Sequence, residues 1–253
     1  MRIAIFTDAY EPHISGVTTS IKMLKETLER MNHEVYIVTA NLQNNKFYYD
    51  EKTKIMYIPG IKTGIYNTKL APIYSNKAMK IIKTWNLDII HSQTEFSIGL
   101  FSRIVARKLN IPVVHTYHTL YEDYVYYVTH GHFKKLSQKI VVKLTKYYCE
   151  KKCDELIVPT KKIKELFINK YNIRKKINVI PTGIDISKFV ETPSIKIEKE
   201  KIKQQYNIKD SDYIIGAVGR IASEKSFDKL LNNAKILIEN NPNIKIMLVG
   251  GGP

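Results

Sequence analysis

Short apolar runs alternate with longer amphipathic stretches along most of the chain. The runs are rich in Ile and Val and lack a strict alternation with polar residues, which is typical of strands covered on both faces. They predict nine strands, at Ile3–Thr7, Glu34–Thr39, Ile55–Ile58, Asp88–His91, Pro112–Thr116, Glu155–Pro159, Asn178–Pro181, Ile214–Gly219 and Lys245–Gly250.

Apolar residues between these runs recur at helical spacing. One predicted stripe contains Ile21, Leu24, Leu28 and Met31, and another contains Leu230, Leu231, Ala234, Leu237 and Ile238. Strands that alternate with helices form parallel sheets through right-handed crossovers. The pattern therefore predicts an α/β protein with doubly wound, Rossmann-like domains.

The alternation breaks between Ile184 and Asp212, where the sequence is polar and the mixed-charge run Lys196–Gln205 predicts a short connecting helix. After the break, two predicted strands and one helix are too few to bury both faces of a sheet. We therefore expect the chain to be the front of a longer protein. The break predicts three segments: an N-terminal domain (1–190), a linker (191–211) and an incomplete second domain (212–253).

Composition narrows the class of protein. Hydrophobic residues make up 44% of the chain and charged residues 25%, as in soluble globular proteins. No uncharged apolar run reaches the length of a membrane span, and the apolar run at the N-terminus is too short for a signal peptide. Cys149 and Cys153 are the only cysteines, so we expect packing roles for them and a cytoplasmic protein.

Positive charge is concentrated in the first part of the chain. Residues 1–190 carry 30 Lys and Arg against 16 Asp and Glu, a net charge of +14, whereas residues 191–253 carry 10 against 8. Such a domain attracts a polyanion, namely nucleic acid, an anionic membrane or phosphorylated substrates. A lysine bias in coding composition is the alternative explanation.

Ligands bind beyond the carboxyl ends of parallel strands, so the residues that follow each strand are the candidates for a site. The first strand is followed by Asp8 and His13, and then by Gly16 at a predicted helix N-terminus, where backbone N–H groups can face a phosphate. A tight turn alone also explains one glycine. The segment is not the G-x-G-x-x-G fingerprint, which disfavours a nicotinamide dehydrogenase.

The fourth and fifth strands also end in polar residues. Glu95 follows the fourth and is predicted to face the cleft, with Thr94 or Ser97 as the cap of the next helix. His118 lies past the end of the fifth strand, with Tyr124 a few residues on. Two histidines beside carboxylates favour a site, although a single histidine is more often structural.

Metal binding does not fit the spacing of these residues. His115-x-x-His118 lacks the i, i+4 geometry of a helical zinc site, and no second cluster completes it. The Asp210-Ser211-Asp212 segment precedes its strand, which is the wrong end of the sheet for a site. The sequence therefore predicts no metal.

Arg220 and Lys225 flank the turn after the strand Ile214–Gly219, just before an amphipathic helix. Two cations, free N–H donors and the positive end of a helix dipole form a diphosphate site without a metal. The alternative is a solvated loop with ordinary basic residues.

These motifs occur in a characteristic order: Gly16, His118, Ile180–Asp185, and the Gly219-Arg220…Glu224-Lys225 segment. In this order the chain resembles, over its whole length, the retaining GT-B glycosyltransferases that use nucleotide sugars. The stretches Ser92–Gly99 and His115–Tyr124 look most like the 1,2-diacylglycerol 3-glucosyltransferases, which transfer glucose from UDP-glucose to diacylglycerol at the cytoplasmic membrane face.

The resemblance implies roles for the matching residues. Gly16 would bring backbone N–H groups to the donor phosphate, and Arg220 and Lys225 would neutralise the departing diphosphate. His118 would contact the sugar near the reacting carbon. The cleft candidates on the acceptor side are Asp8, His13, Glu95 and Tyr124. No cofactor or metal is implied; the donor substrate would be a UDP-sugar.

Two departures from the family pattern stand out. Ser226 replaces the glycine that usually follows the lysine, and we expect its side chain to cap the next helix. The glutamates of the family's E-x7-E segment would lie beyond Pro253, so we expect little activity from residues 1–253 alone.

A basic amphipathic helix is predicted within Lys134–Lys152, which has 7 basic residues and the single acid Glu150. Its predicted membrane-contact face carries Lys135, Lys139, Lys143 and Lys146, with Ile140, Val141 and Leu144 elsewhere. A core helix with a solvated face is the alternative.

The partners expected from the sequence are a nucleotide sugar, a lipid acceptor and an anionic membrane surface, which predicts a peripheral protein on the inner face of the cell membrane. Two alternatives stay open, a soluble sugar or polysaccharide acceptor and, more remotely, a basic nucleic-acid-binding protein. The second lacks a recognisable binding module, so we expect no nucleic acid partner.

Overall fold

The computed structural model describes residues 1–62, 69–120, 134–151, 153–222 and 225–252. The chain forms two compact units, Met1–Asp185 and Ile186–Pro253, and each is described by itself. Among the described residues, no helix is both long enough and apolar enough to cross a membrane.

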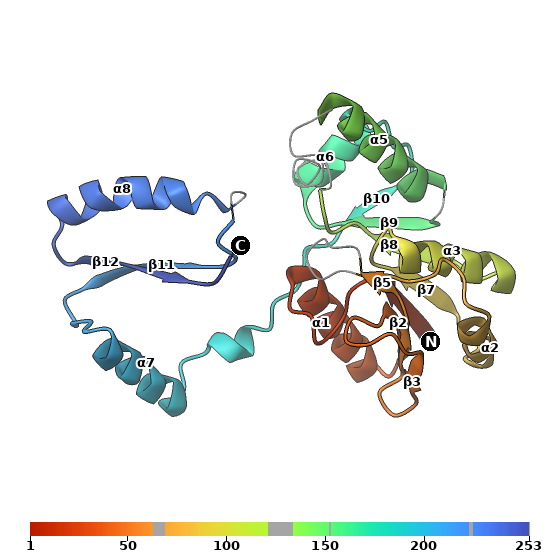
Figure 1. The fold of residues 1–253 in the computed structure, drawn as a ribbon, viewed down its shortest axis with the longest axis horizontal. Coiled ribbons are helices and arrows are strands. Elements are labelled where there is room, and N and C mark those ends of the chain that lie inside the picture. Colours follow the sequence, from red (N-terminus) through yellow and green to blue (C-terminus); the bar gives the residue numbers. More distant parts are fainter. Residues whose placement is uncertain (63–68, 121–133, 152, 223–224, 253) are drawn as a thin grey trace. The chain divides into compact units, whose positions relative to one another are not determined.

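The first unit is built on an eight-stranded sheet with the order β10-β9-β8-β7-β1-β2-β4-β3 (Figure 1). Neighbouring strands are parallel except for β3, which pairs antiparallel with β4. The strands are β1 (Arg2–Thr7), β2 (Glu34–Ala40), β3 (Tyr48–Asp50), β4 (Ile55–Ile58), β7 (Ile89–Ser92), β8 (Val113–Thr116), β9 (Glu155–Val158) and β10 (Ile177–Val179). A separate pair consists of β5 (Ile61–Lys62) and β6 (Lys69–Leu70).

Both faces of this sheet are buried, as the apolar runs predict. Successive residues of β1 alternate between two hydrophobic clusters, with Ile3 and Ile5 in one and Ala4 and Phe6 in the other. The first cluster is covered by α1 (Gly16–Arg30), and the second by α2 (Asn76–Thr84), α3 (Ser97–Leu109) and α6 (Lys161–Asn169). Met31 does not join the α1 stripe: it is the C-cap residue, and 61% of it is exposed.

The helix α5 (Lys134–Lys146) continues into a π-helical turn, η1 (Tyr147–Lys151). Val142, Thr145 and Cys149 face the core at spacings of three and four residues. The prediction that apolar residues lie apart from the lysines is therefore wrong for Ile140 and Leu144. These two are 52% and 51% exposed, because they lie beside the exposed Lys139 and Lys143 on the side away from the core.

The second unit contains η2 (Ile186–Phe189), α7 (Pro193–Gln205), β11 (Tyr213–Val218), α8 (Phe227–Asn240) and β12 (Ile244–Val249). The strands β11 and β12 are parallel, and α8 connects them. None of the described residues of this unit is buried. Leu231 and Ile238 of the predicted α8 stripe remain 53% and 43% exposed, because two strands and one helix supply too little cover.

Ser226 does not cap α8 as expected. It occupies the N-cap position, but its φ of 52° and ψ of 37° are left-handed, and its side chain makes no capping hydrogen bond. A side-chain cap requires extended backbone at this position, as seen at Thr192 before α7. The glycine usual in the family would adopt the left-handed conformation without a Cβ clash.

The substitution Ser226→Gly is therefore expected to raise the free energy of unfolding by about 0.5–1 kcal/mol, because it removes the steric cost of the positive φ. Urea unfolding of the intact protein measures the gain. Ser226→Ala is the matched control, since it removes the hydroxyl and keeps the Cβ. An equal gain from alanine would contradict this explanation.

Candidate active site

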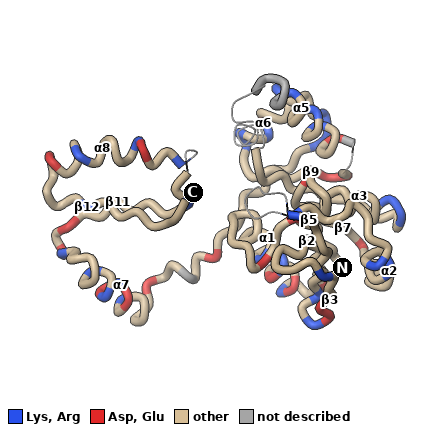
Figure 2. Tube along the Cα trace, in the orientation of Figure 1, with Lys and Arg blue, Asp and Glu red and all other residues tan. Residues whose placement is uncertain are grey.

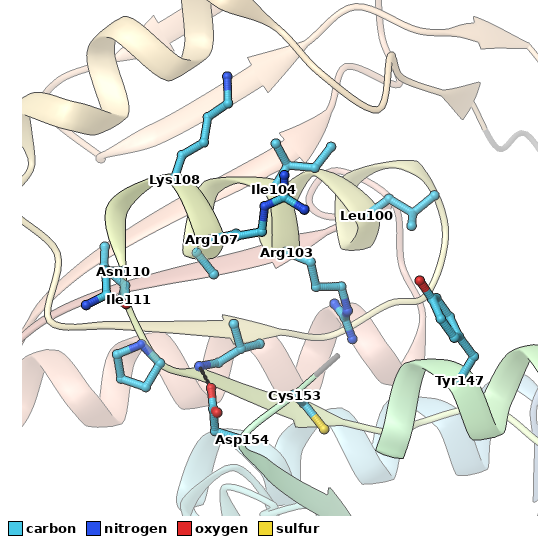
Figure 3. Close-up of a pocket in the computed structure, with 13 residues that line it drawn as sticks. Leu100, Arg103, Ile104, Arg107, Lys108, Asn110, Ile111, Tyr147, Cys153 and Asp154 are labelled. Atoms are coloured by element: carbon cyan, nitrogen blue, oxygen red, sulfur yellow. Dashed lines mark hydrogen bonds between the residues drawn. The ribbon is translucent and has the colours of Figure 1, made fainter. Parts of the chain in front are cut away.

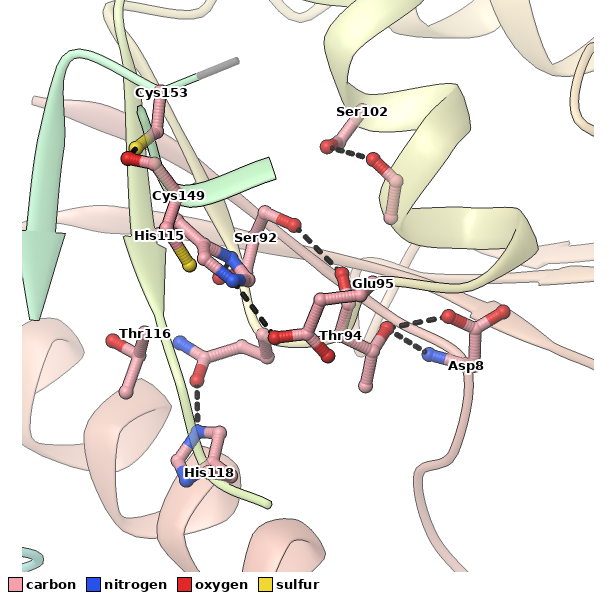
Figure 4. A network of polar contacts seen from close by, with 12 residues as sticks. Asp8, Ser92, Thr94, Glu95, Ser102, His115, Thr116, His118, Cys149 and Cys153 are labelled. Carbon is pink, nitrogen blue, oxygen red and sulfur yellow. Dashed lines mark hydrogen bonds and ion pairs between the residues drawn. The ribbon is translucent and has the colours of Figure 1, made fainter. Parts of the chain in front are cut away.

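The polar residues singled out in the first unit lie at one edge of its sheet. The strand β7 lies between β1 and β8, and all three run in the same direction. After β1, the chain first adds β2 and β4 on one side of β1. It then adds the strands β7 to β10 on the other side, so the topological switch point lies between β1 and β7. Asp8, Gln93–Ser97 and His118 follow the ends of these three strands. Figure 4 shows Asp8, Thr94, Glu95 and His118 at this edge.

Asp8 connects the loop after β1 to the start of α3. Its Oδ2 accepts a hydrogen bond from Thr94 Oγ1 at 2.5 Å, and its Oδ1 accepts from Ser97 Oγ at 2.7 Å and from the Ile98 N–H at 2.9 Å. The Ile98 N–H belongs to the first turn of α3, so a residue 90 positions away caps this helix. The expectation that Thr94 or Ser97 caps it is wrong: the N-cap is Phe96, without a side-chain bond. Burial raises the pKa of the Asp8 carboxyl, although these hydrogen bonds act in the opposite direction.

The loop between β7 and α3 is fixed by close packing against the helix. Ser92 Oγ donates to the Thr94 carbonyl at 3.1 Å. A Cβ on Gly99 would lie 1.9 Å from the same carbonyl oxygen, so only glycine permits this approach. Gln93 and Glu95 are therefore held in defined positions between α3 and β8.

His115 and Glu95 form a buried pair. The Nδ1 of His115 donates to the Ser92 carbonyl at 3.0 Å, and its Nε2 lies 2.9 Å from Glu95 Oε1. The two residues are 0% and 7% exposed. A carbonyl oxygen only accepts, so Nδ1 carries the hydrogen of the bond to Ser92 and Nε2 is the atom that faces Glu95. Glu95 thus faces His115 rather than open solvent.

His118 lies two residues past the end of β8 and is half-buried. Its Nε2 is 2.5 Å from Gln93 Oε1. Burial lowers the pKa of His118 to about 4; the Glu95 charge opposes this shift and His115 adds to it. The ring is thus neutral near pH 7, with Nε2–H donating to Gln93. Within the described part of the chain nothing hydrogen-bonds its Nδ1, which keeps a lone pair for a ligand.

The depressed pKa of His118 makes stability depend on pH. Between its ordinary value of 6.5 and its folded value of about 4, the unfolded state takes up a proton that the folded state does not. The protein is therefore expected to lose stability as the pH falls through this window. Urea unfolding at pH 7, 5.5 and 4.5 should show a smaller loss in His118→Gln, which cannot titrate; equal losses would contradict the assignment.

The remaining predicted residues of the first unit lie at the same edge or outside the described residues. His13 is half-buried in the turn before α1, and its N–H donates to the Tyr10 carbonyl at 3.1 Å. Gly16 is exposed at the first position of α1, after the cap Ser15, and a Cβ there would meet nothing within 4 Å. Tyr124 lies outside the described residues.

Arg220 and Lys225 both lie in the connection between β11 and α8 of the second unit, half-buried and exposed respectively. The acidic pair that precedes β11 is engaged by lysines of its own unit. Asp210 binds Lys203 at 2.6 Å, and Asp212 binds Lys245 at 2.8 Å.

Two residues at the site were missed from the sequence. Gln93 was available in the run that follows β7, but an amide alone carries no signal of chemistry. Arg103 lies on α3, where a helical pattern gives no reason to single out one cation; in the structure its Nη1 donates to Ser92 Oγ at 2.6 Å.

A doubly wound parallel sheet with a polar site at its switch point, followed by a second strand–helix–strand unit, defines the GT-B glycosyltransferase fold. Solved structures agree. The complex of Anabaena HepE with UDP and glucose matches with a TM-score of 0.63 and 16% identity, over 100% of this chain and 62% of that chain. The catalytic domain of starch synthase IV from Arabidopsis thaliana, bound to ADP and acarbose, matches with a TM-score of 0.62 and 13% identity, over 100% and 68%.

The family follows from sequence comparison. Residues 14–188 match the family model Glycosyltransferase Family 4, and residues 198–253 match Glycosyl transferases group 1. The chain therefore belongs to glycosyltransferase family 4, and it is an enzyme sequence of that class.

Two relatives are named alpha-monoglucosyldiacylglycerol synthase. The protein of Streptococcus pneumoniae is 37% identical over 255 residues, and that of Acholeplasma laidlawii is 33% identical over 259. Both alignments cover 100% of this chain, but only 56% and 64% of the relatives. The chain is thus close to diacylglycerol glucosyltransferases and spans somewhat more than half of their length.

Proposed function

We propose that the protein containing this chain is a retaining, metal-independent glycosyltransferase that moves glucose from UDP-glucose to diacylglycerol or a similar membrane lipid. The names of the two relatives support the lipid acceptor, and the UDP and glucose bound to HepE support the donor. The observation that carries the proposal is the site at the switch point, where Gly16 opens α1 and His118 presents a free Nδ1.

Gly16 is proposed to let the donor diphosphate approach the N-terminus of α1. Ser15 Oγ accepts from the Thr18 N–H, which leaves the N–H groups of Gly16 and Val17 for an anion next to the positive end of the helix dipole. Neither packing nor a positive φ requires glycine at this position in the structure. The close approach of a ligand to the backbone would explain a glycine at this position.

In the second unit, Arg220 and Lys225 are proposed to stabilise the negative charge that grows on the nucleoside diphosphate as it leaves. They lie between β11 and the N-terminus of α8, where cations and helix N–H groups can act together. Retention then requires attack on the face from which the diphosphate departs, with its phosphate oxygen available to take the acceptor proton.

The donor site is tested by Gly16→Ala in the intact protein. Because an alanine Cβ at this position meets nothing within 4 Å, stability should not fall. A methyl group between helix and phosphate is nevertheless expected to raise KM for UDP-glucose by about tenfold, roughly 1.4 kcal/mol. Thr19→Ala, on the exposed side of the same helix, is the control. An unchanged KM in Gly16→Ala would remove Gly16 from the donor site.

The proposed location is the cytoplasmic membrane surface, with α5 as a contact. Ile140, Leu144 and Tyr147 are 52%, 51% and 44% exposed at spacings of four and three residues, next to Lys139 and Lys143 in the sequence. Figure 2 shows that basic residues recur along α5. Exposed apolar residues flanked by lysines are typical of a helix that lies in the interface of an anionic bilayer.

Lys146 and Lys135, the other two lysines proposed to contact the membrane, are not supported in the same way. Lys146 lies 3.7 Å from Glu150, so part of its charge is compensated. The side chain of Lys135 lies outside the described residues.

Membrane contact predicts binding to phosphatidylglycerol vesicles and little binding to phosphatidylcholine vesicles, with a decrease in salt. Replacing Lys139 and Lys143 by Gln removes about 2 kcal/mol of attraction, so affinity should fall roughly 30-fold. The control replaces Lys199 and Lys201, which are exposed on α7. Co-sedimentation measures both, and equal losses in the two double variants would refute a role for α5.

The acceptor is tested directly. Intact protein supplied with UDP-glucose should glucosylate diacylglycerol in preference to soluble sugars, and the anomer of the product reports retention. Transfer only to a soluble sugar or a polysaccharide would replace the lipid proposal and leave the donor site unchanged. Activity that survives exhaustive chelation would support transfer without a metal.

A further inference from the structure

A groove of about 850 Å³ lies beside the second half of α3 (Figure 3). Its walls are this helix, the segment from Asn110 to the first residue of β8, Val113, and Tyr147, Cys153 and Asp154 from the η1–β9 region. It reaches the sheet edge at which β8 and β9 begin, whereas His118 follows the end of β8. The groove therefore opens away from the edge that holds the candidate active site.

Arg103 lines this groove and is only 8% exposed. Its Nη1 donates to Ser92 Oγ, the Gly99 carbonyl and Ser102 Oγ at 2.6, 2.8 and 3.1 Å. Its Nε and Nη2 are buried and have no hydrogen-bond partner among the residues that the structure describes. A buried guanidinium with unused donors costs free energy unless an anion accepts from them.

The unused donors are on one edge of the guanidinium. Nε–H and one Nη2–H point in parallel, and two oxygens of a phosphate or carboxylate fit this fork. The π-helical turn η1 supplies a ring on either side, with Tyr148 at 5.3 Å from the guanidinium carbon and Tyr147 on the groove wall. Insertions of this kind in a helix are frequent at functional sites.

A second cation lies nearby, while a third, Lys108, is engaged by another side chain. Arg107 is four residues after Arg103 on α3, on the same side of the helix, and lines the groove. Lys108 also lines the groove, but its Nζ donates to the Tyr74 hydroxyl at 2.9 Å, and its side chain extends from the side of the helix opposite Arg103 (Figure 3). Asp154 adds a negative charge at the far wall, where its Oδ2 accepts from the Val113 N–H at 2.7 Å. An anion is therefore favoured only at the α3 side of the groove.

We propose that this groove binds a phosphate group, with two oxygens on Nε and Nη2 of Arg103 and with Arg107 as the second cation. Leu100 and Ile104, also on the groove wall, offer apolar contact to whatever the phosphate is esterified to. The site does not depend on the proposed glycosyl transfer. Arg103 nevertheless donates to Ser92 Oγ, and the carbonyl of the same Ser92 accepts from His115. The groove and the His115–Glu95 pair are therefore both bonded to Ser92.

The phosphate group that binds Arg103 can belong to a phospholipid head group or to a soluble phosphate. Titration with inorganic phosphate and glycerol 3-phosphate tests the soluble source, and vesicles of phosphatidylglycerol test the lipid source. Arg107→Gln and Lys108→Gln are matched variants for both arms, because each removes one positive charge from adjacent exposed positions on the groove wall, whereas the amine of Lys108 is bonded to Tyr74.

Calorimetry on the intact protein should show saturable binding of at least one of the two soluble phosphates, or the vesicle arm should show the same pattern of variants. Arg103→Lys keeps the charge but loses the fork, so binding is expected to weaken at least tenfold. Arg107→Gln should weaken it three- to tenfold, and Lys108→Gln less than twofold.

The outcomes separate clearly. If Arg103→Lys does not fold, the comparison of Arg107→Gln with Lys108→Gln decides alone. Stronger loss in Arg107→Gln for soluble phosphates assigns a free phosphate, and the same difference seen only with vesicles assigns a lipid head group. Absence of saturable binding in every arm, or equal effects of the two matched variants, overturns the proposal.

Discussion

Replacing His118 by alanine in the intact protein is expected to lower kcat by about 100-fold or more while leaving the fold intact. The ring is neutral because burial lowers its pKa to about 4, and Gln93 holds Nε2–H. A substrate hydroxyl near the reacting carbon can then donate to Nδ1. A steady-state assay with UDP-glucose and diacylglycerol measures the loss, and circular dichroism checks the fold.

His118→Asn provides the matched variant for this prediction. An asparagine amide oxygen can occupy roughly the position of Nδ1, so this variant is expected to retain more activity than alanine. His118→Gln places its amide near Nε2 instead and should resemble alanine. Activity within tenfold of wild type in His118→Ala would show that the ring does not contact the reacting substrate.

The contact between His118 and Gln93 gives a separate test through pH. Gln93 is 3% exposed and 2.5 Å from Nε2, so Gln93→Glu would place a carboxylate against the ring and raise the pKa of His118. The acid limb of the kcat profile is then expected to move from near pH 4 toward neutrality. A profile that keeps its position while activity falls would indicate a merely structural role for Gln93.

The sheets were largely predictable because their signal is local. All nine apolar runs became strands, with ends that differ by at most two residues. In the first unit the signal is strong because burial on both faces demands continuous Ile and Val. The short strands β3, β5 and β6 were missed. They contain two or three residues each, too few for any period to show.

The positions of the candidate residues were predictable in outline, because the carboxyl ends of parallel strands share one edge. Their contacts were not. Asp8 caps a helix that begins 89 residues later, and no spacing in the sequence reveals such a bond. The same holds for Glu95, whose polarity predicted exposure to the cleft, whereas His115 offers it a buried partner.

Backbone conformation and helix orientation also could not be predicted from the sequence. A serine before α8 reads as a cap, yet the turn after Lys225 forces Ser226 into a left-handed conformation that prevents capping. On α5, which apolar residues face the core depends on how the helix packs against the hydrophobic cluster of the first unit. In the structure Val142 packs against the core, whereas Ile140 is exposed to solvent.

The second large effect is expected at Asp8, whose carboxylate holds the ends of β1 and β7 together. Asp8→Ala removes the acceptor of Thr94 Oγ1, Ser97 Oγ and the Ile98 N–H. Leaving three such donors without a partner is expected to cost about 3–4 kcal/mol of unfolding free energy. Urea unfolding measures the total, and hydrogen exchange of the Ile98 amide locates the loss at the start of α3.

Asp8→Asn separates hydrogen bonding from charge. Its amide oxygen can still accept from Ser97 and Ile98, so the expected cost at pH 7 is only about 1 kcal/mol. Because burial raises the folded pKa of Asp8 above its ordinary 3.8, the wild-type carboxyl contributes stability that is complete below pH 3.8 and is lost as the pH rises through the folded value. The advantage of wild type over Asp8→Asn should therefore be larger at pH 4 than at pH 7. An advantage that grows with pH would contradict the raised pKa of Asp8. An alanine variant as stable as the asparagine variant would mean that this side chain does not hold the edge of the sheet.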